Sequence, residues 1–269
     1  MERSFSEGEP GRPAEEPLDE VRYEVVGSVA VLTIDRQYRR NAVNGPTAER
    51  PLEGYNAFEA DDDARVLVLT GAGPDAFCAG ADLKELTSLG DRVFGGDAPL
   101  GFTRTTPTKP TIAAINGWCL AGGLELALWC DLRIAHPDAQ LGFPERRWGV
   151  PLIDGGTQRL PRIVGTGRAL DLILTGRIMH ALEALDWGLL TELDEDPLNR
   201  ALEIAQGLAS FPQQTMLADR HAAIEGFGLS LSDGLALEAK AGPETLQAAV
   251  EGAERFAGGE GRGGAGAGV

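Results

Sequence analysis

The sequence predicts an α/β fold, because short β-branched runs alternate with helical stretches along most of the chain. The 269 residues are 43% hydrophobic and 24% charged, which is typical of a globular protein that buries a sizeable core. From about residue 197 the alternation stops and only helical patterns follow. We therefore expect one large α/β domain over residues 21–210 and a small all-helical region over residues 211–257.

The first expected elements are a strand hairpin and a helix. Residues 23–26 and 29–34 are β-branched runs separated by a Gly-Ser pair, which predicts two strands joined by a tight turn. A helix is expected over residues 47–60. Since Pro51 lies inside this stretch, the helix either begins near Pro51 or bends there.

The middle of the chain continues the alternation of strands and helices. Strands are expected over residues 66–70, 111–116 and 132–135, and an apolar helix over residues 124–130. Residues 71–76 (GAGPDA) have the spacing of a dinucleotide-binding turn, but the helix and second strand of such a unit do not follow them. We interpret these residues as an ordinary turn and expect no nicotinamide or flavin cofactor.

The two ends of the chain differ from its body. Residues 1–20 contain seven acids and three prolines, and residues 258–269 contain seven glycines, so we expect a disordered acidic leader and a disordered Gly-rich tail. Before that tail, helices are expected over residues 198–209, 213–225 and 229–256, the last of them with breaks.

The net charge of −17 excludes several classes of protein. Nucleic-acid binders and polybasic membrane-surface proteins need a positive field, so we expect neither nucleic acid nor membrane as a partner. The three cysteines, Cys78, Cys119 and Cys130, form no CxxC pair, and the three histidines are scattered. We therefore expect reduced thiols, no metal site and a cytoplasmic location.

Two glycine-containing segments are candidates for a ligand site. Residues 77–84 (FCAGADLK) and 117–125 (GWCLAGGLE) place small residues before a helix start, where free N–H groups can bind an anion. Close packing of a strand on a helix is the alternative explanation. Glu125 lies among apolar neighbours, which is unusual for a carboxylate, whereas Glu145 follows a proline at a predicted helix start, where acids are common.

With these segments, several further motifs in the same order make the chain resemble the crotonase superfamily, the enoyl-CoA hydratase/isomerase family. They are RNAV (40–43), KPTIAAIN (109–116), CDLRIA (130–135), FPE (143–145), GGTQRLP (155–161) and EAL with GL (183–185 and 188–189). The resemblance spans residues 29–192. It implies a spiral of repeated ββα units that holds the active site, followed by a small helical region that forms trimers, commonly paired into hexamers.

The resemblance also implies a reaction and its residues. Family members act on coenzyme A thioesters through an enolate whose oxygen is held by two backbone N–H groups, here those of Ala81 and Gly122. The hydratase branch carries two catalytic glutamates, which fall on Glu125, expected to activate water, and Glu145, expected to protonate Cα. The implied substrate-binding residues are Arg40, Ala79, Asp82, Leu83, Lys84 and Gly123. No metal and no cofactor beyond the coenzyme A moiety of the substrate is implied.

Several roles stay open at this stage. Because coenzyme A is polyanionic, Arg36, Arg39, Arg40 and Lys84 are candidates to bind it, and a solvated basic cluster is the alternative. Asp154 stands in a segment where hydratases of this family commonly have small residues, so it is either a third carboxylate of the pocket or a helix cap. Trp148 either forms a wall of the acyl pocket or packs its own helix.

We accordingly expect an enoyl-CoA hydratase that adds water to a 2-enoyl-CoA. Within the same family the alternatives are an enoyl-CoA or dienoyl-CoA isomerase, or another acyl-CoA lyase. The alternative outside catalysis is a protein that binds acyl-CoA without transforming it.

Overall fold

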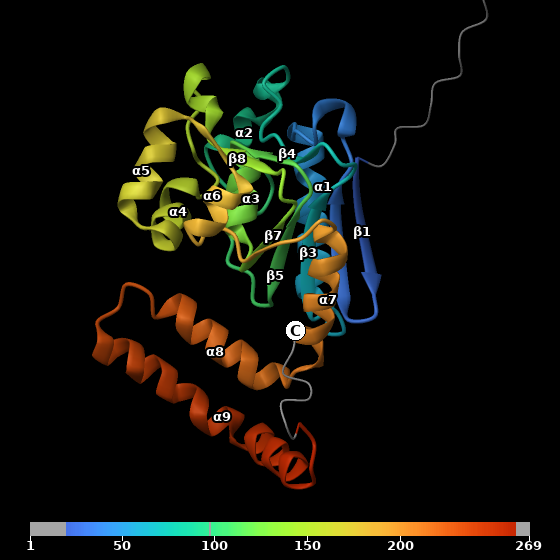
Figure 1. Ribbon diagram of the computed structural model, residues 1–269, viewed down its shortest axis with the longest axis vertical. Helices are drawn as coiled ribbons and strands as arrows, with labels where there is room; N and C mark the ends of the chain where they lie inside the picture. The colour runs from blue at the N-terminus through green and yellow to red at the C-terminus, as the bar shows by residue number, and fades with distance from the viewer. Residues whose placement is uncertain (1–19, 97, 262–269) are drawn as a thin grey trace, which may run out of the picture.

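The computed structural model describes residues 20–96 and 98–261 and confirms the α/β class. Two sheets form its centre, with helices around them (Figure 1). The larger sheet has the strand order β1-β2-β3-β5-β7-β10 and the smaller one β4-β6-β8-β9. The strands of the larger sheet are β1 (Val21–Val26), β2 (Val29–Ile34), β3 (Val66–Gly71), β5 (Thr111–Ile115), β7 (Leu132–Ala135) and β10 (Glu192–Leu193). Those of the smaller sheet are β4 (Ala76–Cys78), β6 (Trp118–Leu120), β8 (Gln140–Gly142) and β9 (Ile178–His180).

The chain steps from the larger to the smaller sheet three times, as β3 to β4, β5 to β6 and β7 to β8. Neighbouring strands of the larger sheet are parallel except β1 and β2, which form the expected antiparallel hairpin. The glycine-containing turn at residues 71–76 leads directly into β4, in agreement with its interpretation as a turn. This repeated step is the spiral that the resemblance implies.

Strand β3 shows how the larger sheet is buried on both faces. Leu67 and Leu69 belong to the main core, which lies between the sheets and the helices α1 (Gly45–Ala60) and α3 (Gly122–Trp129). Val66 and Val68 face the other way and pack with Ala201 and neighbouring residues of α7 (Pro197–Ser210). Because both faces are covered, the strand is a continuous apolar run rather than an alternating one.

Helix α1 (Gly45–Ala60) corrects one expectation. The side chain of Asn44 caps its first turn by accepting a 2.9 Å hydrogen bond from the N–H of Thr47. The helix therefore begins well before Pro51 and continues through it, so the start near Pro51 was wrong. The remaining helices of the body are α2 (Gly90–Val93), α3 (Gly122–Trp129), α4 (Gly156–Val164), α5 (Thr166–Thr175) and α6 (Ala181–Asp186), with 3-10 turns at η1 (Gln37–Arg39), η2 (Leu86–Leu89) and η3 (Pro144–Trp148).

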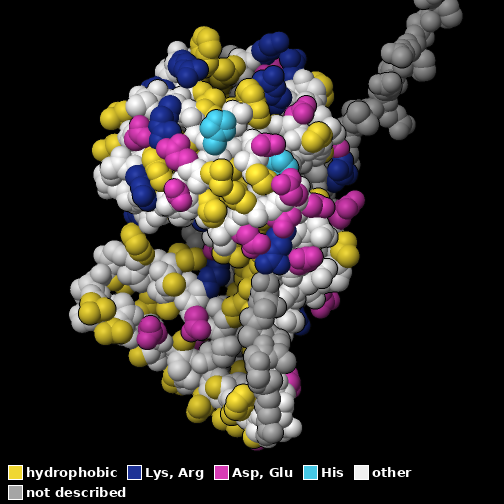
Figure 2. Space-filling model, viewed as in Figure 1, with side chains coloured by type: hydrophobic (Ala, Val, Ile, Leu, Met, Phe, Trp, Pro, Cys, Tyr) yellow, Lys and Arg dark blue, Asp and Glu magenta, His cyan; other side chains and the backbone are white. Residues whose placement is uncertain are grey.

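The C-terminal helices α8 (Gln213–Glu225) and α9 (Leu231–Ala257) lie beside each other below the sheets in Figure 1. The predicted breaks in the last helix are wrong, because α9 is one helix that contains Pro243. Neither helix has a buried residue, and yellow apolar side chains lie open over this region in Figure 2. Arg220 joins α8 to the body through 2.9 and 3.0 Å bonds to Asp131.

Most of the predicted leader and tail lies outside the described residues. Glu20, at the end of the predicted leader, is held by Thr47, Tyr38 and Arg36. Residues 258–261 form turns after α9. Among the described helices, none combines the length and apolar character needed to span a bilayer.

Candidate active site

A mostly apolar cavity of about 550 Å³ brings the two glycine-containing segments together. Three carboxyl-bearing residues line it, Glu125 from α3, Glu145 from η3 and Asp154 from the loop before α4. The other lining residues are Ala79, Ala81, Leu83, Leu86, Thr87, Leu89, Gly90, Val93, Phe94, Pro99, Leu100, Ala121, Gly122, Pro144, Trp148, Gly149, Val150, Pro151 and Ile153. Ionisable groups in such a cavity are candidates for catalysis.

Two backbone N–H groups at this cavity have no protein acceptor in the part of the chain that the structure describes. The short bridge between Val43 and Ala81 uses the carbonyl of Gly80 and the N–H of Asp82, which leaves the N–H of Ala81 unused. The N–H of Gly122 stands at the first position of α3, where an α-helix supplies no acceptor. Both groups are thus available to a negatively charged oxygen.

Gly80, which precedes Ala81, packs closely against the segment that carries Gly122. Its φ of +86° favours glycine, and a Cβ placed on it would lie 2.8 Å from the nitrogen of Gly122. Ala121, just before Gly122, has a φ of +54°, an uncommon conformation for a residue with a side chain. An unusual backbone conformation therefore directly precedes each of the two donor residues that line the cavity.

Glu125 is buried, with 2% of its surface exposed. Its Oε1 accepts hydrogen bonds from the N–H groups of Asp154 at 3.0 Å and Gly156 at 2.7 Å. A Cβ on Gly156 would lie 2.9 Å from that oxygen, so glycine is needed for this contact. The carboxyl group is thereby anchored on one oxygen.

Glu145 is held differently, in the 3-10 turn η3 that follows Pro144. It is 5% exposed, and neither carboxyl oxygen has a hydrogen-bond partner within the described residues. A buried and unpaired carboxyl group is costly to keep ionised. It also differs from an ordinary N-terminal helix acid, which faces solvent.

The environment of both carboxyl groups shifts their titration toward neutral pH. Burial, with the nearby charges of Asp154 and Glu145, raises the pKa of Glu125 to about 8. Burial raises the pKa of Glu145 to about 7. The charge of Glu145 contributes to the raised pKa of Glu125, so between these two values the two groups together retain one proton, which rests mainly on Glu125.

The structure distinguishes between the two interpretations of Asp154, a helix cap and a third carboxylate of the pocket. Helix α4 begins after Gly155, and no side chain caps its first turn, so Asp154 is not a helix cap. Its Oδ1 instead accepts from the N–H of Leu100 at 3.0 Å and from the hydroxyl of Thr103 at 2.6 Å. Asp154 is thus a third carboxyl-bearing residue of the pocket, and burial raises its pKa.

The structure brings only part of the predicted binding set to the cavity. Ala79, Leu83 and Trp148 line it, and Trp148 is 72% exposed at its wall instead of packed on its own turn. Four other candidates do not line it. They are Arg40, whose guanidinium lies 4.6 Å from the ring centre of Trp118, together with Lys84, Gly123 and Asp82. Their binding roles stay predictions.

Arg36, a candidate for coenzyme A binding, has a structural position instead. It is 2% exposed and donates to Asp82 at 3.1 Å, Glu20 at 3.1 Å and the carbonyl of Ala42 at 2.7 Å. The carboxylate of Asp82 is committed to the same ion pair. Arg36 therefore joins the loop after β2 to the segment that carries Ala81.

Replacing Arg36 with alanine is expected to lower the free energy of unfolding by about 3–5 kcal/mol, because the buried Asp82 carboxylate loses the nearer of its two cationic partners and keeps only Arg39 at 3.7 Å, and the carbonyl of Ala42 loses its donor. Urea unfolding of the purified variant measures this. Arg50→Ala, which removes an exposed pair with Glu53, is the matched control and should cost less than about 1 kcal/mol. Equal losses in the two variants would show that Arg36 is not a structural ion-pair residue.

The sequence did not single out the individual residues that form much of the cavity wall. Leu86, Phe94 and Leu100 line the cavity, and they belong to residues 85–108, a segment expected to shape the pocket but without a readable motif. Their contact with the glycine-containing segments depends on how the chain folds between β4 and β5. No local signal in the sequence indicates that path.

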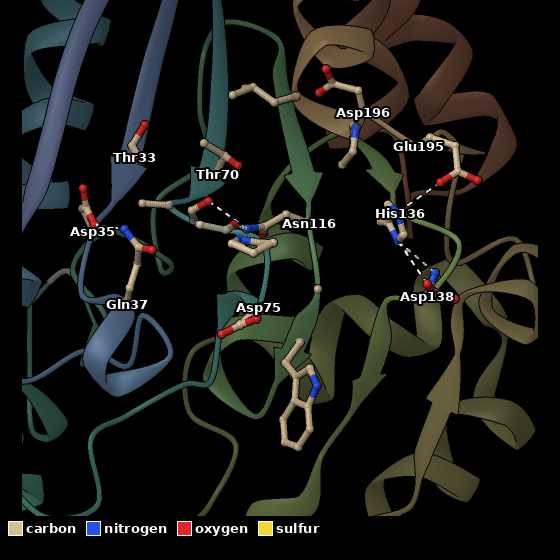
Figure 3. Close-up of a pocket in the computed structure, with 18 of the residues that line it drawn as sticks. Thr33, Asp35, Gln37, Thr70, Asp75, Asn116, His136, Asp138, Glu195 and Asp196 are labelled. Atoms are coloured by element: carbon tan, nitrogen blue, oxygen red, sulfur yellow. Dashed lines mark hydrogen bonds and ion pairs between the residues drawn. The ribbon is translucent and has the colours of Figure 1, made fainter.

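A second, polar cavity of about 780 Å³ lies at the carboxyl ends of β2, β3, β5 and β7 (Figure 3). Figure 3 shows His136 between Glu195 and Asp138, with the His136–Glu195 contact at 3.2 Å. Arg22 pairs with Asp35 on the opposite side. None of the predicted site residues lines this cavity, and these charged groups pair with one another. We therefore assign the active site to the apolar cavity.

Comparison with known proteins shows which family the chain belongs to. A model of the enoyl-CoA hydratase/isomerase family matches residues 24–259. The chain belongs to the enoyl-CoA hydratase/isomerase family. This family membership accounts for the spiral fold and for the ordered motifs that form both walls of the cavity.

Several relatives are similar over most of their length. The chain is 38% identical to a short-chain-enoyl-CoA hydratase of Clostridium acetobutylicum over 230 residues, 83% of this chain and 88% of the relative. It is 36% identical to a crotonyl-CoA hydratase of Syntrophomonas wolfei over 219 residues, 79% of this chain and 84% of the relative. The crystal structure of enoyl-CoA hydratase EchA1 from Mycobacterium marinum, at 35% identity, gives a TM-score of 0.83 over 88% of this chain and 95% of that chain.

Proposed function

We propose that this member of the enoyl-CoA hydratase/isomerase family is an enoyl-CoA hydratase, which adds water to the double bond of a 2-enoyl-CoA. The observation that carries the proposal is one cavity that holds two buried carboxyl groups, Glu125 and Glu145, beside the unused N–H groups of Ala81 and Gly122. The names of the relatives, hydratases for short-chain enoyl-CoA and crotonyl-CoA, support it.

The proposed reaction uses each of these groups once. The thioester oxygen accepts hydrogen bonds from the N–H groups of Ala81 and Gly122, so negative charge that develops on it is stabilised. Water attacks Cβ while the Glu125 carboxylate takes its proton, and the electron pair of the double bond moves into the thioester enolate. The enolate then takes a proton at Cα from the carboxylic acid of Glu145. Proton exchange with solvent restores both carboxyl groups.

Isomerisation of an enoyl-CoA or dienoyl-CoA is the second candidate, and Asp154 favours it. A third carboxyl-bearing residue in the cavity adds a group that can carry a proton between carbons. Such a reaction moves the double bond and incorporates no oxygen. It needs the same enolate and the same two N–H donors.

Incubation with a short 2-enoyl-CoA in ¹⁸O-labelled water separates the candidates. A hydratase gives 3-hydroxyacyl-CoA that carries the label, detected by mass spectrometry. Movement of the double bond without incorporation of the label would show that the protein is an isomerase rather than a hydratase. Binding of the thioester without either change, and without exchange of solvent protons at Cα, would show an acyl-CoA binder.

The proposed pair of carboxyl groups predicts a narrow bell-shaped pH profile. One group must accept a proton while the other donates one, so only the singly protonated pair can be active. Because the pKa of Glu125 is the higher of the two, the proton of that pair rests mainly on Glu125, and the proposed reaction proceeds from the minor form in which it rests on Glu145. Below about pH 7 both groups hold a proton and no base is left, and above about pH 8 both are ionised and no acid is left. We expect kcat/KM to fall on both sides of this range, measured with a 2-enoyl-CoA in buffers of constant ionic strength. A rate that stays flat across this range and well beyond it on both sides would contradict the two-carboxyl mechanism.

Further parts of the proposal concern the cofactor, location and assembly. Water and the acyl-CoA are the only reactants, so the reaction requires no cofactor beyond the coenzyme A moiety. The three cysteines are free and buried, which supports a reducing, cytoplasmic location. A homotrimer or hexamer would cover apolar residues of α9 such as Leu231 and Leu246, which are 80% and 63% exposed. Sedimentation of the full chain measures its mass.

A further inference from the structure

Asp154 is a buried ionisable residue that the proposed reaction does not use. It is 4% exposed and lines the cavity between α3 and the segment of residues 98–105. Its Oδ1 accepts two hydrogen bonds from that segment, at 3.0 Å from the N–H of Leu100 and 2.6 Å from the hydroxyl of Thr103. Within the described residues its Oδ2 has no hydrogen-bond partner. Since a buried carboxyl group costs stability, its presence calls for a role.

Asp154 also contacts Glu125 through its backbone. Its N–H donates to Oε1 of Glu125 at 3.0 Å. Arg159 strengthens the same junction, because it donates to the carbonyl of Asp154 at 3.1 Å and to that of Thr103 at 2.6 Å. One residue therefore joins the anchored glutamate to the segment of residues 98–105, part of which lines the cavity.

Leu100 extends this connection to the N–H donor of Gly122. A Cβ placed on Gly122 would lie 2.4 Å from Cδ1 of Leu100, so the leucine side chain packs directly over that glycine. The N–H of the same Leu100 is bonded to Asp154. Displacing Leu100 would change both the wall of the cavity and the surroundings of the N–H donor.

We propose that Asp154 is a positioning residue. It holds Glu125 and the segment of residues 98–105 in a fixed arrangement, and with that segment it holds the Leu100 side chain over Gly122. The inference rests on the proposed function for its kinetic consequences. Its electrostatic consequence does not depend on the reaction. The Asp154 carboxylate lies near Glu125 and opposes the ionisation of that glutamate, which raises its pKa.

Other titratable groups act on the same two residues. Glu145 also opposes ionisation of Glu125, whereas Arg104 and Arg159 favour the ionised form of Asp154. Burial raises the pKa of the Cys78 thiol to about 12, so it is neutral near pH 7. The negative charge of Asp154 is therefore the largest charge effect on Glu125 apart from burial.

Three variants separate the charge of Asp154 from its hydrogen bonds. Asp154→Asn keeps an acceptor oxygen for Leu100 and Thr103 but removes the charge. Thr103→Val removes one hydrogen bond and keeps the charge, and it is the matched control. Asp154→Ala removes both. Thermal unfolding and circular dichroism show whether each variant is folded.

The expected kinetic results differ among the three. In Asp154→Asn the fall of kcat/KM at alkaline pH should occur about one pH unit lower than in the wild type. The reason is that the pKa of Glu125 falls when the nearby negative charge is removed. Thr103→Val should leave this alkaline fall in place and lower kcat by about 3- to 10-fold with little change in KM, the equivalent of one hydrogen bond. Asp154→Ala should lower kcat by up to about 100-fold through misplacement of the reacting groups.

A measurement without substrate keeps the inference separate from the proposed reaction. In protein labelled with ¹³C at the glutamate carboxyl carbons, the Glu125 signal, identified by its loss in Glu125→Gln, should titrate about one pH unit lower in Asp154→Asn. This shift is expected even if the protein proves to have no hydratase activity. An unchanged Glu125 titration in a folded Asp154→Asn variant would overturn the electrostatic part. Wild-type kcat in both Asp154→Ala and Thr103→Val would overturn the positioning role.

Discussion

Replacing Glu125 or Glu145 with glutamine is expected to lower the rate of hydration by about 10²- to 10⁴-fold, the usual contribution of one general acid or base. Glutamine keeps the shape of the side chain but can neither take a proton from water nor give one to Cα. The rate is measured as the loss of the enoyl thioester absorbance under saturating substrate. In Glu125→Gln the amide oxygen replaces the carboxylate oxygen as the acceptor for the N–H groups of Asp154 and Gly156, so the anchoring hydrogen bonds are retained.

The controls for this experiment separate chemistry from binding. Glu203→Gln, on the exposed face of α7, changes the net charge equally and should leave the rate unchanged. The affinity for a saturated acyl-CoA, which cannot react, should stay within a few-fold in both site variants. Full activity in a folded Glu145→Gln protein would remove this residue from the mechanism.

Five of the six strands of the larger sheet were predictable because they carry their own signal, whereas the two residues of β10 carry none. Residues of β2 and β3 are apolar on both faces, so their burial can be read locally without knowledge of the fold. The strands of the smaller sheet were not predicted from their own residues. Three residues such as Trp118–Leu120 are too few to show a period, and their pairing with β4 and β8 depends on the spiral as a whole.

The two glutamates were predicted by motif, and the structure adds why their titration is shifted. The apolar neighbours of Glu125 in sequence already indicated burial, because charged side chains are rarely placed there. The environment of Asp154 was not predictable in the same way. Its partners Leu100 and Thr103 lie about 50 residues earlier in the chain, and a local rule suggested a helix cap instead.

The position of Arg36 also could not be predicted from its neighbours in the sequence. Its sequence neighbours Arg39 and Arg40 suggested either a site for an anionic ligand or a solvated basic cluster. In the structure its partners Asp82 and Glu85 come from the end of the first glycine-containing segment and just beyond it, a stretch that pairs with the loop following β2. Charge clusters in a sequence therefore do not by themselves distinguish a ligand site from an ion pair formed by folding.

Removing the N–H group of Ala81 is expected to raise the activation barrier by about 2.7–4 kcal/mol, which lowers kcat about 10²- to 10³-fold. Ala81→Pro removes that group. Within residues 20–96 and 98–261 no acceptor uses this N–H, since the bridge to Val43 employs the carbonyl of Gly80 and the N–H of Asp82. Proline therefore deletes a donor to the enolate oxygen without deleting a hydrogen bond of the native chain.

The matched control is Ala81→Val, which adds side-chain bulk at the same place and keeps the N–H group. We expect this variant to change KM through crowding of the cavity and to retain most of kcat, because its oxyanion donor is still present. If proline and valine lowered kcat equally while both proteins remained folded, bulk rather than the lost donor would be responsible. A loss confined to proline would assign to the Ala81 N–H the stabilisation of charge that the enolate mechanism requires.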